Sequence, residues 1–221
     1  MLVVFTEPRN DINMNNIIDL INLLQITRVQ PQYGYSIAGK NMRQGNIAEH
    51  HYLVTMIGWQ LAELVNSKGA KIDTLKVLKF CLLHDVGEIF GGDIGMYYAK
   101  ANPKARNAAK KFEEENQRFL SQYFGNKKEV LNLTKEILES NSDEAHIAKI
   151  ADYLEVTHYK LFNDQLKGKD HVLVAPKLTE KVSKIKDKIA KKELLTFINI
   201  WSKKMSKYNS FLDASTDALK V

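Results

Sequence analysis

Apolar residues recur along this chain at the three- and four-residue spacing of helices, and few stretches show the alternation of a strand. The pattern therefore predicts an all-α fold. Each of the four prolines falls outside the expected helices, where helix breakers belong. These helices span 13–25, 46–66, 74–90, 104–124 and 127–139, followed by one that begins at 142 and a long final helix over 178–208.

A chain of 221 residues is long enough to bury a full core, and we expect 1–221 to form a single domain. The polar motifs lie within about 13–165, and the final helix is expected to pack against them without chemistry of its own. The segment 165–176 is expected to be a loop, and the tail 210–221 has little to hold it in place.

Two of these helices carry expectations about burial. The first helix is expected to be well buried because it concentrates six apolar residues, namely Ile17, Ile18, Leu20, Ile21, Leu23 and Leu24. The helix over 104–124 is expected to bury Phe112, Phe119, Leu120 and Tyr123. Its acidic run 113–115 is expected to be solvated, because consecutive helical residues point about 100° apart.

Composition excludes several classes of protein. No apolar run approaches the roughly 20 residues of a membrane-spanning helix, and the first residues turn polar too quickly for a secretory signal. Cys81 is the sole cysteine, which fits a cytoplasmic protein without disulfides. The net charge of +6 comes largely from late lysines that alternate with apolar and acidic residues, as on a solvated helix face. We therefore expect neither a membrane nor a nucleic-acid partner.

Four polar residues occupy expensive positions on otherwise apolar helices. His50 lies on the buried face of its helix, His84 and Asp85 close a strongly apolar run, and Asp152 follows Ala151 on a small-residue face. Two neutral imidazoles and two carboxylates suit one divalent cation with coordination positions left open. The alternatives without a metal ion are that His84 simply ends its helix and that Asp152 forms a salt bridge to a cation such as Lys149.

The next histidine, His51, shares a face with Thr55 and is expected at the surface or behind the ligands.

The order His, His-Asp, Asp on successive helices resembles the HD superfamily of metal-dependent phosphohydrolases, and within it the bacterial 5′-deoxynucleotidases. The resemblance covers about 28–159 and is carried by four segments in order. They are Arg28, Asn46-x-x-Glu49-His50, His84-Asp85-x-x-Glu88-x-x-x-Gly92-Asp93 and Lys149-x-Ala151-Asp152.

The resemblance implies a role for each matching residue. His50, His84, Asp85 and Asp152 would bind one divalent ion (Mn, Co, Fe, Zn, Ni or Mg), and Asp85 and Asp152 would also contact substrate. Glu88 would orient or deprotonate the attacking water, and Asp93 would touch the substrate and assist proton transfer. Arg28 would hold the phosphate. The residues implied to line the nucleotide are Ile94, Gly95 and Met96. A homodimer is implied as well.

The chain departs from the deoxynucleotidases at one wall of the expected pocket. Those enzymes follow the arginine with a tryptophan that excludes a ribose 2′-hydroxyl, but here Val29 follows Arg28, and the segment up to His50 is longer. Deoxyribose selectivity would then be lost, or it would come from Tyr33, Tyr35 or another part of that segment. Arg43 is the alternative phosphate ligand, and Lys149 is a further candidate.

The leading hypothesis is a phosphomonoesterase acting on deoxynucleoside 5′-monophosphates. A deoxynucleoside triphosphate hydrolase, which releases tripolyphosphate, is the alternative within enzymes, because Lys40 and Arg43 could reach a longer phosphate chain. A non-catalytic nucleotide-binding regulator is the alternative outside them. The presence of both Glu88 and Asp93 argues against a regulator, which needs neither.

Overall fold

The computed structural model describes residues 13–32, 45–163, 165–166 and 170–220. Within these residues the chain is helical, and its β structure is one isolated bridge between Pro31 and Asn46, which confirms the all-α fold. None of the described helices is long and apolar enough to cross a membrane. The helices are α1 (Met14–Leu24), η1 (Gln25–Arg28), α2 (Ile47–Asn66), α3 (Thr74–Leu83), η3 (Val86–Phe90), α4 (Met96–Ala101), α5 (Pro103–Ser121), α6 (Lys127–Glu139), α7 (Asp143–Phe162), α8 (Asp170–Ser183), α9 (Lys188–Met205) and α10 (Phe211–Ala218).

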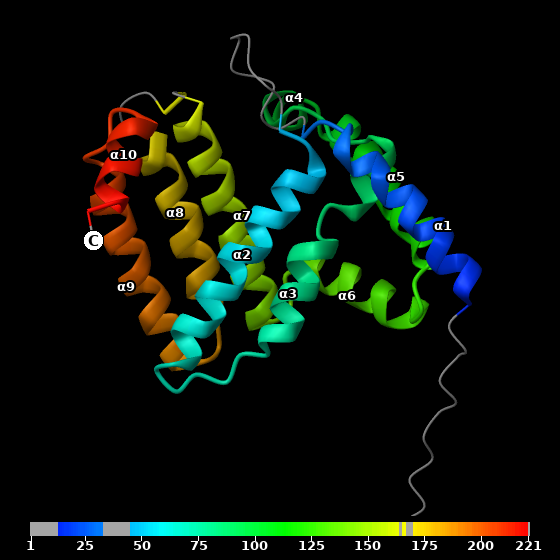
Figure 1. Cartoon of the computed structure of the whole chain (residues 1–221), viewed down its shortest axis with the longest axis horizontal. Helices are drawn as coiled ribbons and strands as arrows, with labels where there is room; N and C mark the ends of the chain where they lie inside the picture. The colour runs from blue at the N-terminus through cyan, green and yellow to red at the C-terminus, as the bar shows by residue number, and fades with distance from the viewer. Residues whose placement is uncertain (1–12, 33–44, 164, 167–169, 221) are drawn as a thin grey trace, which may run out of the picture.

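Three helices form the centre of the fold. α2 and α7 pack along each other, and α3 packs against both (Figure 1). α8 and α9 cover one side of this centre with α10 at their end, whereas α5, α6 and α1 lie on the other side. The fold thus places the three expected ligand segments, which come from α2, the end of α3 and α7, beside one another.

A glycine lets α2 and α3 approach closely. A Cβ atom at Gly58 would lie 2.6 Å from Cys81 Sγ and 3.3 Å from Val77 Cγ1, which is too close for a buried contact. The surrounding core is apolar and fully buried, with Val54, Val77 and Phe80 at 0% exposure. The close approach fixes the separation of His50 and His84, which lie on these two segments.

The expectation that the first helix is well buried is wrong, since none of its residues is buried, and the expectation for 104–124 is only partly correct. Ile17, Ile18 and Ile21 are 41–56% exposed, because α1 lies at the edge of the fold with few helices to cover it. Phe112 and Phe119 are each 47% exposed, although Leu120 is buried as expected. Apolar periodicity identifies a face, but whether another element covers that face depends on the tertiary arrangement.

The C-terminal expectations need correction. The expected loop 165–176 contains the first turns of α8, and Pro176 lies inside that helix. The expected single helix over 178–208 is two helices, because α8 ends at Ser183 and α9 begins after Asp187. The tail forms α10, where Asp217 accepts a hydrogen bond from the Tyr208 hydroxyl at 2.7 Å.

Asp187 caps α9 and joins it to the turn before α3. Its Oδ1 accepts hydrogen bonds from the backbone N–H groups of Ile189 and Ala190, and its Oδ2 accepts one from Lys71 at 3.1 Å. These donors, that of Ala190 foremost, hold the pKa of the Asp187 carboxyl below its ordinary value. The carboxylate therefore stabilises the fold while it is ionised.

Replacing Asp187 with alanine is expected to lower the free energy of unfolding by about 1–2 kcal/mol at pH 7. Because the folded-state pKa is lowered, the difference between wild type and variant is present above pH 3.8 and is lost as the pH falls through the lowered value. Urea unfolding of both proteins at pH 7 and pH 3 checks this. A difference that is unchanged at pH 3 would contradict the ionised cap.

Candidate metal centre

His84 and Asp85 lie where the third helix ends rather than within it. α3 stops at Leu83, His84 is its C-cap, and the backbone of Asp85 leaves helical geometry at φ −115° and ψ 16°. The short helix η3 follows and ends at Gly91, whose φ of 96° a residue with a Cβ atom rarely adopts. The expected helix over 74–90 is therefore two helices, and the change in direction between them aims His84 and Asp85 at one place.

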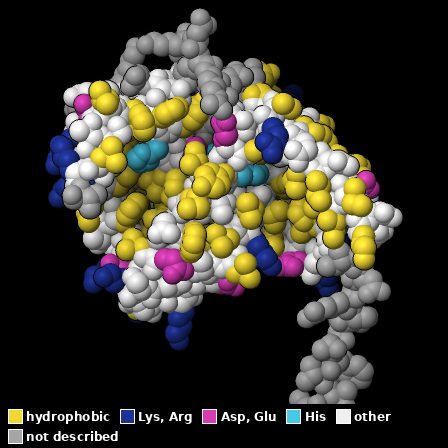
Figure 2. Space-filling model, viewed as in Figure 1, with side chains coloured by type: hydrophobic (Ala, Val, Ile, Leu, Met, Phe, Trp, Pro, Cys, Tyr) yellow, Lys and Arg dark blue, Asp and Glu magenta, His cyan; other side chains and the backbone are white. Residues whose placement is uncertain are grey.

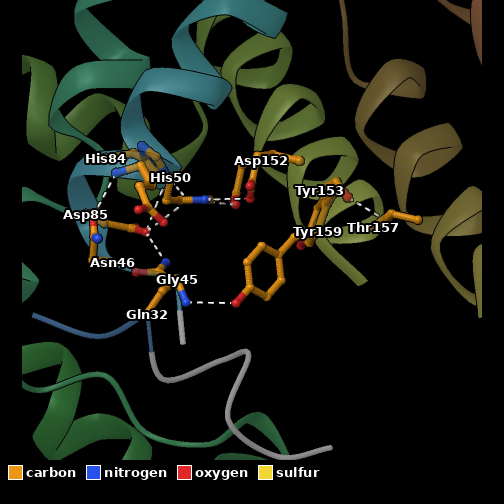
Figure 3. Close-up of polar contacts among 12 residues, drawn as sticks. Gln32, Gly45, Asn46, His50, His84, Asp85, Asp152, Tyr153, Thr157 and Tyr159 are labelled. Atoms are coloured by element: carbon orange, nitrogen blue, oxygen red, sulfur yellow. Dashed lines mark hydrogen bonds and ion pairs between the residues drawn. The ribbon is translucent and has the colours of Figure 1, made fainter. Parts of the chain in front are cut away.

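The side chains of His50, His84 and Asp85 meet between α2, α3 and α7 (Figure 3). His50 Nε2 lies 3.1 Å from His84 Nε2 and 3.5 Å from Asp85 Oδ2, and His84 Nε2 lies 3.3 Å from the same oxygen. Asp152 Oδ1 approaches from α7 to 3.6 Å from His50 Nε2. The structure thus brings His50, His84 and Asp85 into one cluster, and it places Asp152 beside His50 at the edge of that cluster.

Both imidazoles are oriented by an acceptor on their outer side. His50 Nδ1 lies 2.7 Å from Glu155 Oε2, and His84 Nδ1 lies 2.9 Å from the Cys81 carbonyl oxygen. Since each acceptor requires a proton on Nδ1, the Nε2 lone pairs of both neutral rings point at each other. Two lone pairs at 3.1 Å repel unless a cation or a proton lies between them.

The contacts within the cluster shift the pKa values of His50 and Asp85 in opposite directions. Burial lowers the pKa of His50, but its contacts with Asp85 and Glu155 outweigh burial and raise that pKa to about 10. Burial works against ionisation of Asp85, yet His84 and His50 hold the Asp85 pKa well below its ordinary value. Without a metal, the proton on His50 therefore supplies the positive charge that this cluster of acceptors demands.

The cluster fits a divalent metal ion. Ligand atoms bound at about 2.1 Å to one ion lie about 3.0–3.4 Å apart at octahedral or tetrahedral angles, close to the separations of 3.1–3.6 Å seen here. Gln32 Oε1, His51 Nε2 and Glu88 Oε2 are also buried nearby without a hydrogen-bond partner among the described residues. Unsatisfied polar atoms beside such a cluster indicate a site built for a polar ligand.

The metal-ligand and salt-bridge interpretations of Asp152 are compatible. Its Oδ2 accepts a hydrogen bond from Lys149 Nζ at 3.3 Å, while its Oδ1 faces His50. Burial lowers the pKa of Lys149, but Asp152 and Asp85 outweigh burial and raise it above its ordinary value. Lys149 therefore stays positively charged beside the cluster.

Glu88 lies on η3 in a strongly acidic surrounding. Burial, together with the carboxylates of Asp85, Asp93 and Glu113, raises the pKa of Glu88 to about 11, so this side chain holds a proton at neutral pH without a metal. Burial and Asp85 also raise the pKa of Glu113 to about 7. The expectation that 113–115 is wholly solvated is wrong for Glu113, which is half-buried and whose Oε1 accepts a hydrogen bond from Gln117 Nε2 at 3.0 Å.

α5 supports η3 through direct contact. A Cβ atom at Gly87 would lie 2.7 Å from the Glu113 carbonyl oxygen, so the two helices meet at a glycine. Asn116 Nδ2 donates a hydrogen bond to the Gly87 carbonyl oxygen at 2.7 Å. Glu88 therefore projects from a firmly held segment.

The expected substrate-contacting residues vary in position. Asp93, Ile94 and Gly95 follow η3 in the chain and precede α4. Asp93 and Ile94 are half-buried, and Gly95 is buried. The side chain of Met96 lies outside what the structure describes. Arg28 is exposed and its Nε donates to Gln25 Oε1, although η1 packs against η3. Val29 is 79% exposed. Tyr33, Tyr35, Lys40 and Arg43 lie outside the described residues.

Three contacts at the site have no clear signal in the sequence. Gln32 is buried, and its Nε2 donates to Asp85 Oδ2 at 2.9 Å. His51 is buried, with its ring centroid 4.9 Å from that of His84, so a surface position is wrong and a place behind the ligands is correct. Glu155 shares a helical face with Asp152, and that spacing was the one available indication of its contact with His50.

Fold and site together define an all-α protein with a candidate metal centre of two imidazoles and carboxylates. The family model described as "HD domain" matches residues 32–194, so the chain belongs to the HD domain family.

Three relatives illustrate the similarity. The 5′-deoxynucleotidase HDDC2 of Dictyostelium discoideum is 26% identical over 145 residues, which cover 65% of this chain and 75% of that protein. The crystal structure of PH0347 protein from Pyrococcus horikoshii OT3 matches with a TM-score of 0.66 and 24% identity over 84% of this chain and 98% of its own. The HD phosphohydrolase DatZ of cyanophage S-2L, bound to dA and one catalytic Zn²⁺ ion, matches with a TM-score of 0.55 and 18% identity. The match covers 83% of this chain and 96% of DatZ.

Proposed function

We propose that this HD-family protein is a metal-dependent phosphohydrolase that removes phosphate from deoxynucleoside 5′-monophosphates. The convergence of His50, His84 and Asp85, whose ligand atoms lie within 4.8 Å of one another, carries the proposal. The name of the Dictyostelium relative supports the substrate class. We also propose that the whole chain forms one cytoplasmic HD-type domain.

The ligands proposed for the ion are His50, His84, Asp85 and Asp152. A bound divalent ion supplies a Lewis acid and lowers the pKa of water. Asp85 and Asp152 would contact substrate as well, while Lys149 offers its positive charge to the phosphate. Arg28 would add a second cation if its side chain turns from Gln25 toward η3, against which η1 packs.

The reaction forms one bond to phosphorus and breaks another. The oxygen of water attacks phosphorus, the bond to the nucleoside 5′-oxygen breaks, and that oxygen takes up a proton. Glu88, on the firmly held η3, is proposed to orient the water and exchange its proton. Asp93 is proposed to touch the sugar side of the substrate and assist proton transfer to the leaving oxygen. Ile94, Gly95 and Met96 are proposed to line the nucleotide.

A panel of nucleotides tests the function. The protein loaded with Co²⁺, Mn²⁺ or Zn²⁺ is incubated with dAMP, AMP and dATP, and the products are separated. We expect phosphate and deoxyadenosine from dAMP. Tripolyphosphate from dATP instead would establish the triphosphate hydrolase, and metal binding without turnover of any nucleotide would favour a regulator. The ratio of dAMP to AMP turnover reports whether the protein selects deoxyribose although Val29 stands where the deoxynucleotidases have a tryptophan.

We further propose that the protein is a homodimer. Figure 2 shows apolar side chains across one face of the molecule, and Tyr52, Leu53, Met56 and Trp59 are 39–64% exposed on one side of α2. Such a row suits contact with a second copy. Light scattering behind size exclusion is expected to give twice the chain mass, and a monomer at every concentration would refute the dimer.

A further inference from the structure

The carboxylate of Glu155 lies behind the metal cluster, on the side of His50 opposite Asp85. Its Oε2 is 2.7 Å from His50 Nδ1, and the two side chains are 4% and 0% exposed. A buried carboxylate is costly unless it meets a cation or a strong donor. The contact with His50 therefore offsets the cost of burying the Glu155 carboxylate.

The formal charges around His50 show what Glu155 adds to the metal centre. Asp85 and Asp152 touch His50 with one negative charge each, but Lys149 binds Asp152 and cancels one of them. Glu155 adds a negative charge on the other side of His50, so the formal charges of Asp85, Asp152, Lys149 and Glu155 sum to −2. Removing Glu155 takes one buried negative charge away from the neighbourhood of His50, which weakens the attraction of the cluster for a divalent cation.

The geometry adds a second effect. The contact with Glu155 requires the proton of a neutral His50 to reside on Nδ1, which turns the Nε2 lone pair toward His84 and Asp85. A carboxylate acceptor also makes the imidazole a stronger ligand than a neutral acceptor does. His84 has the weaker arrangement, since its Nδ1 meets the backbone carbonyl of Cys81.

We propose that Glu155 is a positioning residue that sets the affinity of the metal centre, by fixing the tautomer of His50 and by adding a negative charge beside that ligand. The inference rests on the metal centre of the proposed function but not on the identity of the substrate. Glu155 lies one turn beyond Asp152 on α7, and its contact with His50 at 2.7 Å is shorter than the contact of His84 with the Cys81 carbonyl oxygen at 2.9 Å.

Two variants separate the two effects. Glu155→Gln removes the charge but keeps an oxygen that can accept from Nδ1, and Glu155→Leu removes both. Glu144→Gln is the matched control, because it makes the same exchange on the same helix about 16 Å away. The probe is Co²⁺ alone, titrated calorimetrically into the full-length protein, with the visible absorption spectrum reporting its coordination and thermal melts reporting folding.

We expect Glu155→Gln to weaken Co²⁺ binding about 10-fold and Glu155→Leu about 100-fold, with a reduced rise in Tm on adding metal and an unchanged control. Co²⁺ affinities of both variants within about twofold of wild type would overturn the inference. If Glu155→Leu fails to fold, the glutamine variant decides alone.

The test also separates this inference from the proposed function. A wild-type protein that binds no Co²⁺ refutes both of them. A protein that binds Co²⁺ and loses affinity in Glu155→Gln, yet releases no phosphate from any monophosphate, upholds the role of Glu155 while the substrate assignment fails.

Discussion

Replacing Asp85 with asparagine is expected to abolish detectable phosphate release, with a loss of at least about 1000-fold in kcat/KM. Asp85 Oδ2 lies 3.3 Å and 3.5 Å from the two imidazole nitrogens, so it contributes both a ligand atom and a negative charge to the cluster. An amide keeps the shape but loses the charge, and it can turn an NH₂ group toward the site. The measurements are phosphate release from dAMP and calorimetric Co²⁺ affinity.

The matched control is Asp19→Asn, which makes the same exchange at an exposed position of α1. It is expected to leave both measurements unchanged. If Asp85→Asn bound Co²⁺ as wild type does, or retained a tenth of the activity, Asp85 would not be a ligand and the proposed centre would have to be redrawn around other residues.

The second large effect is expected at Glu88. Glu88→Gln should lower kcat by about 10²–10⁴-fold while Co²⁺ affinity changes less than about threefold, because its role is proton exchange rather than ligation. The isosteric amide preserves packing against α5 but cannot gain or lose a proton. Kinetics on dAMP from pH 5 to 9 should show that one limb of the wild-type pH–rate profile is missing in the variant.

Glu115→Gln provides the control, since Glu115 lies on the exposed side of α5 and is 65% exposed. It should match wild type at every pH. Wild-type kcat in Glu88→Gln would exclude Glu88 as the acid–base group and would turn attention to Asp93. Loss of metal affinity in the same variant would instead place Glu88 among the ligands.

The sequence predicted local features of the helices better than the packing between them. The spacing along 46–66 correctly places His50 on the buried face of α2, because a helix whose polar residue interrupts a regular apolar stripe is easily recognised. α6 occupies the predicted 127–139, and α7 begins at the predicted serine cap, Ser142. These successes depend on local periodicity and capping, which a single sequence records directly.

The errors involve information that is not local. The exposure of Ile18 on α1 and the burial of His51 depend on which elements happen to pack against each face. The break between α8 and α9 depends on Asp187 and on Asp143, which accepts hydrogen bonds from the backbone of residues 186 and 187 across the fold. The contacts of Gln32 and Glu155 join residues 53 and 105 positions apart, a pairing that periodicity does not contain.

The bridge between Pro31 and Asn46 joins the two described segments on either side of residues 33–44. The N–H of Gln32 donates to the Gly45 carbonyl oxygen at 2.9 Å, and the N–H of Ile47 donates to that of Gln30 at 3.1 Å. The flanking residues Gln32 and Gly45 are thus held together, and Gln32 lies beside the metal cluster. Lengthening a segment closed at its base costs little, since doubling a loop adds only about 0.6 kcal/mol. Insertions between Gln32 and Gly45 are therefore expected to leave the cluster of His50, His84 and Asp85 unchanged, because these residues lie outside the lengthened segment.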